Sequence, residues 1–306
     1  TAFNVPFEGS TKVACYFAFR AMLLDTATIS EHVPQNEGSF RPIKVIAPKG
    51  SIFNPIYPAA AEARFNQIQR VVDCIIKALA PAIPDKVTAG CSADVSAIAY
   101  SGVRPEGNYW IFIEVNEGSY GGRPKSDGPD GIEELMRNTR NNPIEDLGMH
   151  LPLICDRYEL RDDVMPGAGE YRGGIGMVKV QRYLTDGYLT HESDRHDDAP
   201  WGFLGGSDGS GARVQKFNIA TPDKIEELPA KVHGLRNLKG DCIGVLNACG
   251  GGYGDPLARS PEQVREDVLD DFCTVEHARE AYGVILNAEL GIDASATEAR
   301  RGEMRG

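Results

Sequence analysis

The stretch Pro166-Gly-Ala-Gly-Glu-Tyr-Arg-Gly-Gly-Ile-Gly176 is the part of this sequence that decides the fold. Three similar glycine-rich segments accompany it, at residues 118–124, 202–211 and 250–256. Glycine is favoured where the backbone takes a positive φ or approaches another backbone closely. Four such segments, each followed by patterned sequence, predict a packed framework of polyproline-like segments rather than a flexible linker.

The spacing of these glycines excludes the familiar nucleotide-binding loops. Neither GxxxxGKS/T nor GxGxxG occurs at a predicted strand-to-helix junction, so we expect no phosphate-cradling loop or dinucleotide fingerprint in this chain. No Ser-His-Asp trio is marked out by the sequence, and any trio picked from it would be arbitrary.

Composition limits the partners that we expect. The 306 residues carry a formal net charge of -12, and no run of Lys and Arg offers a surface for phosphates, so we expect no nucleic-acid partner. The apolar stretch at residues 13–24 is interrupted by Arg20 and is too short to span a bilayer, so no membrane association is expected. Seven scattered cysteines without a CxxC pair indicate reduced thiols and a cytoplasmic location.

The sequence opens on Thr1 without a methionine. Removal of Met before a small residue and cleavage of a longer precursor both account for this. An N-terminal Thr can act as a nucleophile, but no supporting base is found near it in the sequence. We therefore expect no catalytic role for Thr1.

Periodicity predicts helices over residues 10–24, capped by Ser10 or Thr11, and over residues 59–80, ended by Pro81. Two C-terminal helices are expected, with the caps, first-turn proline and final glycine that helix ends favour: Ser260 with Pro261, and Thr274 with Gly283.

Apolar runs predict strands at residues 41–47, 109–115, 153–160, 175–184 and 241–246. The run Tyr109-Trp-Ile-Phe-Ile-Glu-Val115 is so apolar that we expect a buried strand, whereas residues 190–213 are expected to form a long loop. The chain is therefore predicted to be α+β and rich in β-structure, with peripheral helices. A subdivision is suggested between residues 1–125, a helix and strand part, and residues 126–306, a glycine-rich β part.

Two polar strings attract attention as candidate sites. Asn138-Thr-Arg-Asn-Asn-Pro-Ile-Glu145 can bind a carbonyl, a carboxylate or a phosphate through the planar fork of Arg140, or it can be an Asx-turn network that stabilises a loop. His191-Glu-Ser-Asp-Arg-His-Asp-Asp198 has ligand types that suit zinc or manganese, but charged loops often produce such clusters, and we expect no metal there.

Taken together, several strings resemble the hydantoinase B/oxoprolinase family, in family order and across nearly the whole chain. They are Asn36-Glu-Gly-Ser-Phe-Arg-Pro-Ile43, Pro48-Lys-Gly-Ser51, Glu117-Gly-Ser-Tyr-Gly-Gly-Arg123, Asn138-Thr-Arg-Asn-Asn-Pro143, Arg157-Tyr-Glu-Leu-Arg161, Gly169-Glu-Tyr-Arg-Gly-Gly174, Pro200-Trp-Gly202, Gly250-Gly-Gly-Tyr-Gly-Asp-Pro256 and Tyr282-Gly-Val284. Members of the family are usually longer, and this chain resembles their C-terminal part. The HxxDxGG-type metal motif of the family's N-terminal region has no counterpart here.

The resemblance implies a β-rich, barrel-like fold and a role in a heteromeric, ATP-dependent enzyme. In such a complex ATP and Mg²⁺ are held by a hydantoinase A-like partner, and a B-type subunit helps to open a hydantoin, 5-oxoproline or lactam ring. Related acetone and acetophenone carboxylases use similar subunits, so a ketone carboxylase is the alternative, and a noncatalytic scaffold is a third. The implied partners are the hydantoinase A-like subunit, a chain that carries the N-terminal half of the B-type subunit, and a small-molecule substrate.

Candidate site residues follow from residue type and motif position. Ring opening needs donors for developing negative charge and groups that hold phosphate or move a proton. The candidates for catalysis are Asn138, Arg140, Asn141, Glu145 and Asp127, and those for substrate or phosphate binding are Arg123, Arg195, Gly121 and Gly122. The resemblance places the divalent metal, zinc or manganese, outside this chain.

Overall fold

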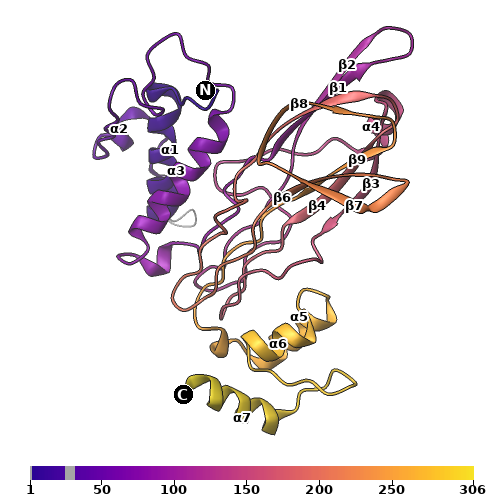
Figure 1. Ribbon diagram of the computed structural model, residues 1–306. Coiled ribbons are helices and arrows are strands. Elements are labelled where there is room, and N and C mark those ends of the chain that lie inside the picture. Colours follow the sequence, from indigo (N-terminus) through magenta and orange to yellow (C-terminus); the bar gives the residue numbers. More distant parts are fainter. Residues whose placement is uncertain (1, 25–31) are drawn as a thin grey trace. The chain divides into compact units, whose positions relative to one another are not determined.

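The computed structural model describes residues 2–24 and 32–306, and Thr1 lies outside these residues. The chain forms two compact units (Figure 1). Unit 1 contains the residues up to Val87 together with Ala93–Val95 and Leu135–Arg137, and unit 2 contains Thr88–Ser92, Ser96–Glu134 and Asn138–Gly306. The main boundary therefore falls at Val87, whereas the sequence suggested a subdivision at 125/126.

Unit 1 is helical. Its elements are η1 (Phe7–Thr11), α1 (Lys12–Leu23), α2 (Glu37–Phe40), α3 (Arg64–Leu79) and η3 (Pro84–Lys86). The buried face of α3 carries polar residues as well as apolar ones. Asn66 accepts a hydrogen bond from the Val95 amide at 3.0 Å, and Gln69 accepts one from the Met136 amide at 3.2 Å. These bonds explain why two distant segments of the chain belong to the helical unit.

Three predictions for unit 1 need correction. Residues 41–47 begin in a turn and form no strand, because no strand of the described residues pairs with them, and Ile46 is 77% exposed. The helix predicted from residue 59 begins at Arg64. The Thr11 side chain does not cap α1; its hydroxyl instead donates to the Phe53 carbonyl at 2.8 Å.

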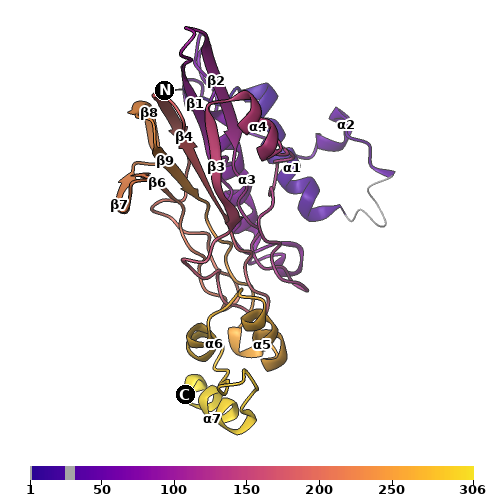
Figure 2. The ribbon, with the colours of Figure 1, turned by 90° about the vertical axis from the view of Figure 1, so that its right-hand side faces the viewer.

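Unit 2 contains two antiparallel sheets (Figures 1 and 2). Sheet I has the order β2-β1-β5-β8 and sheet II the order β3-β4-β9-β6-β7. The strands of sheet I are β1 (Ala97–Val103), β2 (Tyr109–Val115), β5 (Gly187–Glu192) and β8 (Lys231–Asn237). Those of sheet II are β3 (Leu153–Leu160), β4 (Met177–Tyr183), β6 (Arg213–Asn218), β7 (Thr221–Leu228) and β9 (Asp241–Leu246).

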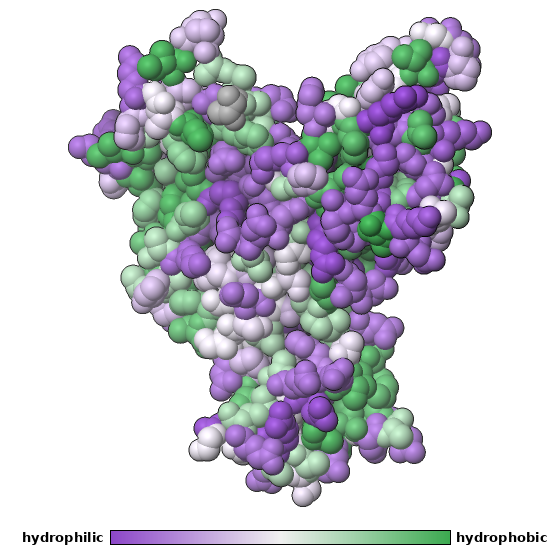
Figure 3. Space-filling model, in the orientation of Figure 1, coloured by the Kyte–Doolittle hydropathy of each residue, from purple (hydrophilic) through white to green (hydrophobic). Residues whose placement is uncertain are grey.

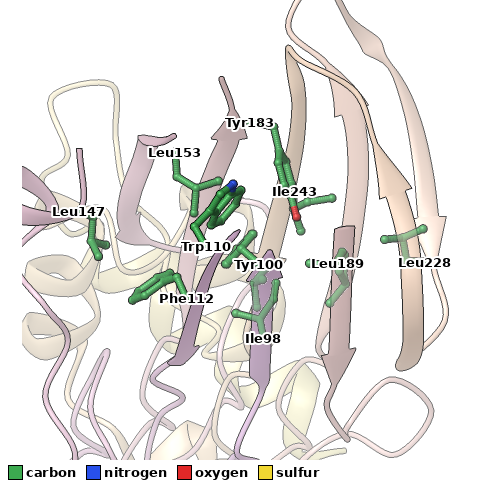
Figure 4. Close-up of a cluster of buried hydrophobic side chains, with 12 residues drawn as sticks. Ile98, Tyr100, Trp110, Phe112, Leu147, Leu153, Tyr183, Leu189, Leu228 and Ile243 are labelled. Carbon is green, nitrogen blue, oxygen red and sulfur yellow. The ribbon is translucent and has the colours of Figure 1, made fainter. Parts of the chain in front are cut away.

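The main core lies between the two sheets, which pack face to face (Figure 4). Aromatic rings join them, with the Tyr183 ring centroid 5.9 Å from that of Tyr100 and 6.4 Å from that of Trp110. Each sheet keeps two edge strands within the described residues, so the expected barrel-like arrangement is not found. The chain is α+β, with two open antiparallel sheets and several helices.

Strand β2 has the predicted bounds, but it is buried on one face only. Trp110, Phe112 and Glu114 point into the core, whereas Tyr109, Ile111 and Ile113 alternate with them and are exposed. The predicted loop at 190–213 also differs, because β5 extends to Glu192.

The glycine-rich segments pack on one another as expected, without forming strands. The Gly250 amide donates to the Gly174 carbonyl at 2.9 Å, and the Gly174 amide donates to the Tyr120 carbonyl at 2.8 Å. A Cβ atom on Gly250 would lie 2.0 Å from the Tyr120 carbonyl oxygen, and one on Gly173 would lie 1.9 Å from that of Gly250. Only glycine permits backbones to approach so closely.

Beyond the glycine-rich segments, the chain ends in short helices (Figures 1 and 2). They are η4 (Pro256–Ala258), α5 (Pro261–Leu269), α6 (Val275–Ala281) and α7 (Ala294–Arg305), and a further helix, α4 (Ile144–His150), packs on β3. The predicted caps are confirmed: Ser260 accepts from the Gln263 amide, Thr274 accepts from the His277 amide, and Gly283 has φ of 63°.

Hydrophilic residues are spread over the face shown in Figure 3, with hydrophobic residues between them. None of the helices in residues 2–24 and 32–306 is long and apolar enough to cross a membrane.

Candidate functional site: a pocket at the edge of sheet I

A pocket of about 190 Å³ opens at edge strand β2. One wall is the end of β2, and the other is the polar string that the sequence singled out. Its lining residues are Phe112, Ile113, Glu114, Val115, Thr139, Arg140, Asn141 and Asn142. The pocket lies wholly within unit 2, and it brings Arg140 and Asn141 next to a carboxylate that the sequence had not indicated.

That carboxylate, Glu114, is paired with a buried lysine. The Lys179 ammonium on β4 donates to Glu114 Oε2, and the two side chains are only 2% and 5% exposed. Burial raises the pKa of Glu114 because desolvation disfavours its charge, and the Lys179 ammonium acts in the opposite direction. The pair therefore bridges sheets I and II and presents an acid with a raised pKa to the pocket.

Tyr158 connects this pair with the polar string. Its ring lies under the Lys179 ammonium, 4.8 Å from nitrogen to ring centroid. Its hydroxyl donates to Glu117 at 3.1 Å and accepts a hydrogen bond from the Asn141 amide. Burial, followed by the charge of Glu117, raises the pKa of Tyr158 to about 12, so the phenol stays protonated at neutral pH.

The other residues of the polar string are open to solvent. Thr139 donates to Glu133 at 2.7 Å, and Arg140 lies exposed on the pocket wall. Asn138 is exposed just before the pocket-lining residues, and Glu145 is exposed in the first turn of α4. Of the candidates from this string, the pocket thus contains Arg140 and Asn141.

The remaining candidates belong to the glycine-rich framework. A Cβ on Gly121 would lie 2.2 Å from the Ala89 carbonyl oxygen, so Gly121 marks a close backbone approach, and Gly122 marks another. The Arg123 guanidinium donates to the Asp127 carbonyl at 2.9 Å. The Asp127 carboxylate in turn receives both terminal nitrogens of Arg259, at 2.6 and 2.8 Å.

Arg195 is also held by the framework. It is 5% exposed, and its guanidinium donates to the carbonyls of Cys91 and Ser92, each at 2.7 Å. The five candidates outside the polar string, Gly121, Gly122, Arg123, Asp127 and Arg195, are therefore not lining residues of the pocket at β2.

The two histidines of the string at 191–198 do not meet at a metal centre. His191 is 1% exposed and lies on β5 opposite Ile98, whereas His196 is within 2.8 Å of the Ser193 hydroxyl. Across the described ranges, no group of three or more His, Cys, Asp or Glu side chains is arranged to hold a metal ion.

Sequence reasoning missed Glu114, Lys179 and Tyr158. A signal for two of them exists, because Glu114 shares the inward parity of Trp110 and Phe112, and Lys179 stands between two valines of a strand. A charge at an inward strand position indicates a buried partner of opposite sign. The sequence gives no sign of which partner it is.

Comparison with known proteins agrees with the fold described above. Acetone carboxylase in its nucleotide-free structure superposes with a TM-score of 0.81 over 99% of this chain and 45% of its own, at 18% sequence identity, which establishes the fold.

Two relatives are similar in sequence. A protein of Pseudomonas sp. strain NS671, named as the B-type subunit of a D-/L-hydantoinase, is 44% identical over 299 residues, 97% of this chain and 50% of the relative. The beta chain of the caprolactamase of Pseudomonas jessenii is 29% identical over 88% of this chain and 48% of the relative. The chain thus spans about half the length of these curated relatives. The sequence model of the hydantoinase B/oxoprolinase family matches residues 1–256, and the chain therefore belongs to that family.

Proposed function

We propose that this chain is part of the B-type subunit of an ATP-dependent cyclic-amide hydrolase. The relatives named for their substrates act on hydantoin and caprolactam, both of which contain an amide bond in a ring. Acetone carboxylase, which represents the alternative chemistry, is similar at 18% identity and supports only the fold. The sequence similarity therefore favours ring opening over ketone carboxylation.

The observation that carries this proposal is the pocket at β2, where donors and an acid meet. Opening a cyclic amide requires donors for the negative charge that develops on the carbonyl oxygen and a proton for the departing nitrogen. In our proposal Arg140 and Asn141 hold the oxygen while water adds to the carbonyl carbon, and the C–N bond of the ring then breaks. Glu114, with its raised pKa, takes a proton from the water and gives one to the ring nitrogen, and Lys179 keeps the carboxyl in place.

The framework residues have a different role in the proposal. Arg123, Asp127 and Arg195, with Gly121 and Gly122, hold the glycine-rich segments under the sheets. Asn138 and Glu145 flank the pocket wall and position the string between them.

The rest of the machinery is proposed to lie on partner chains. A hydantoinase A-like partner holds ATP and Mg²⁺, and a chain that corresponds to the remainder of the B-type subunit carries the divalent metal. All seven cysteines are free thiols, and we propose that the complex works in the cytoplasm.

Replacing Arg140 by Ala in the assembled complex tests the proposal. Loss of one donor to a developing oxyanion typically lowers turnover by about 100-fold or more, so ATP-dependent opening of hydantoin, 5-oxoproline and caprolactam should fall by about that factor. The matched control is Arg279→Ala, at an exposed position of α6. Native mass spectrometry verifies that both variants assemble.

Three results would redirect the proposal. Unchanged ring opening by an intact Arg140→Ala complex would favour a scaffold role for this chain. Incorporation of bicarbonate into acetone or acetophenone, without ring opening, would favour the carboxylase. A stable chain that forms no complex at all would remove the enzymatic proposal.

A further inference from the structure

The outer face of sheet I carries a contiguous apolar patch. We name as the outer patch the side chains of Tyr109, Ile111 and Ile113 on β2, Val103 on β1 and Tyr188 on β5. They are 68%, 54%, 62%, 57% and 51% exposed, respectively. The strand register joins them, because Val103 lies opposite Tyr109, and Ser101 lies between Ile111 and Tyr188.

Small residues lie in the middle of the outer patch. Ala99 stands opposite Ile113 on one side and Thr190 on the other, and Ser101 occupies the next outward position of β1. The short side chains of Ala99 and Ser101 thus stand between the larger residues of β2 and Tyr188 of β5. A contiguous apolar face on a sheet marks an interaction site.

The residues at the edge of the same sheet also indicate an interaction site. Within the described residues, β2 has β1 as its sheet neighbour and is an edge strand. Edge strands left open to water usually carry charges or prolines, yet the outward positions of β2 are Tyr, Ile and Ile. By contrast, edge strand β7 of sheet II is Thr-Pro-Asp-Lys-Ile-Glu-Glu-Leu, with the charge and proline expected of an open edge. The outward residues of β2 therefore indicate an edge that another polypeptide covers, whereas those of β7 indicate an edge that is open to water.

The length of the relatives indicates what covers the outer patch and the edge of β2. This chain matches 50% of the hydantoinase relative and 48% of the caprolactamase relative, so a segment about as long as this chain is present in the relatives and unmatched here. A polypeptide of that length is large enough to bury the outer patch and the edge of β2. Such an interface within one polypeptide, or between two permanent partners, is typically apolar.

The position of the pocket links the outer patch to the candidate site. Ile113 belongs both to the outer patch and to the pocket wall, and the pocket is open. A polypeptide on the outer patch would therefore reach the mouth of the pocket. We infer that the outer patch docks the companion polypeptide that corresponds to the remainder of the B-type subunit, and that the companion completes the pocket. This inference rests on the proposed function for the identity of the companion.

Co-expression provides the test. The probe is the segment of the Pseudomonas sp. NS671 hydantoinase relative that this chain does not match, produced together with this chain and purified through a tag on the probe. The test variant is Val103→Lys/Ile111→Lys, which places two charges on the outer patch and leaves the lining residues of the pocket unchanged. The matched control is Ile219→Lys/Ile225→Lys, because these isoleucines are 48% and 51% exposed at and beside β7. Circular dichroism of each chain alone verifies the fold.

The expected result is a one-to-one complex of the wild-type chain with the probe, and hydrogen exchange slowed in residues 97–115. The test variant should lower the recovered complex at least tenfold, whereas the control variant should bind like the wild type. Equal recovery of the test variant and the wild type would overturn the inference. Absence of a wild-type complex would overturn it as well, and so would a dimer of this chain alone that the test variant abolishes.

Measuring ring opening as well as binding distinguishes failure of the proposed function from failure of the docking surface. If the wild-type chain binds the probe through the outer patch, but the complex with a hydantoinase A-like partner opens no cyclic amide, the function is wrong and the docking surface stands. If ring opening proceeds with the test variant at wild-type rate, the docking surface is wrong and the function stands.

Discussion

At the scale of single residues, the buried pair of Lys179 and Glu114 has the largest energetic consequence. Removing one partner of a buried ion pair leaves an uncompensated charge and typically costs about 3–5 kcal/mol. We expect Lys179→Met to lower the free energy of unfolding by that amount, because the Glu114 carboxyl stays 5% exposed without a cation. Urea denaturation followed by fluorescence measures the change.

The double variant Glu114→Gln/Lys179→Met serves as the control for this prediction. It removes both charges from the same buried place, so it should recover much of the stability that Lys179→Met loses. A loss below about 1 kcal/mol for Lys179→Met alone would show that the pair is solvated in solution.

The residues of the pocket show which parts of the candidate site could be predicted from the sequence. Arg140 and Asn141 were singled out as members of one polar string, because residue type is visible in a sequence, and both line the pocket. Their roles remain predictions. Glu114 could not be matched with Lys179 from the sequence, since the pairing depends on two sheets facing each other at that level.

At the scale of elements, the glycine-rich framework predicts opposite effects for two Gly→Ala changes. In Gly250→Ala, the new Cβ would lie 2.0 Å from the Tyr120 carbonyl oxygen, a backbone atom that cannot move alone. We expect a destabilisation of about 3 kcal/mol or more, at the upper end of overpacking. Thermal unfolding, with yield of folded protein, measures it.

The control for this prediction is Gly302→Ala on α7. Apart from its chain neighbours and the backbone of its own helix, no heavy atom of the described residues lies within 4 Å of its added Cβ, and alanine is the better helix former by about 1 kcal/mol. This variant should therefore be more stable than the wild type. Equal effects of the two changes would contradict the close packing of the framework.

The strands show where sequence patterns fail. Strands with inward apolar residues, such as β2 and β3, were predicted because burial on one face leaves an alternating pattern or an apolar run. Strands β1, β5, β6, β7 and β8 were missed. In β7 and β8 most side chains are exposed and polar, so the pairing of these two strands rests on backbone hydrogen bonds. Residues 41–47 were predicted as a strand and do not form one. Their apolar and polar residues alternate because some of the side chains are half-buried, although no strand pairs with the segment.

At the scale of the whole molecule, buried histidines predict how stability depends on pH. Burial, reinforced by His196 and the positive charge of Lys231, lowers the pKa of His191 to about 3 from an ordinary value of 6.5. The folded state therefore keeps His191 neutral while the unfolded state takes up a proton. Its contribution is fully present above pH 6.5 and is lost as the pH falls toward 3.

Urea midpoints at intervals between about pH 7.5 and 5 measure this dependence. Each unit of pH in the lower part of that range should reduce the free energy of unfolding by about 1.4 kcal/mol for this one group. His191→Leu should make the slope shallower by that amount, whereas His233→Leu, an exposed position on β8, should leave it unchanged. An identical slope in both variants would assign the acid sensitivity to other groups.

The hydrogen bonds from Val95 and Met136 to the helix α3 side chains have a consequence for the order of synthesis. Helix α3 ends at Leu79, but one of its buried polar side chains finds its backbone partner only in the segment Leu135–Arg137. The helical unit thus cannot finish folding on the ribosome until strands β1 and β2 have emerged. A nascent chain stopped before residue 135 would expose Gln69 to water, and a protease cut at the Val87 boundary would not release the helices as a complete unit.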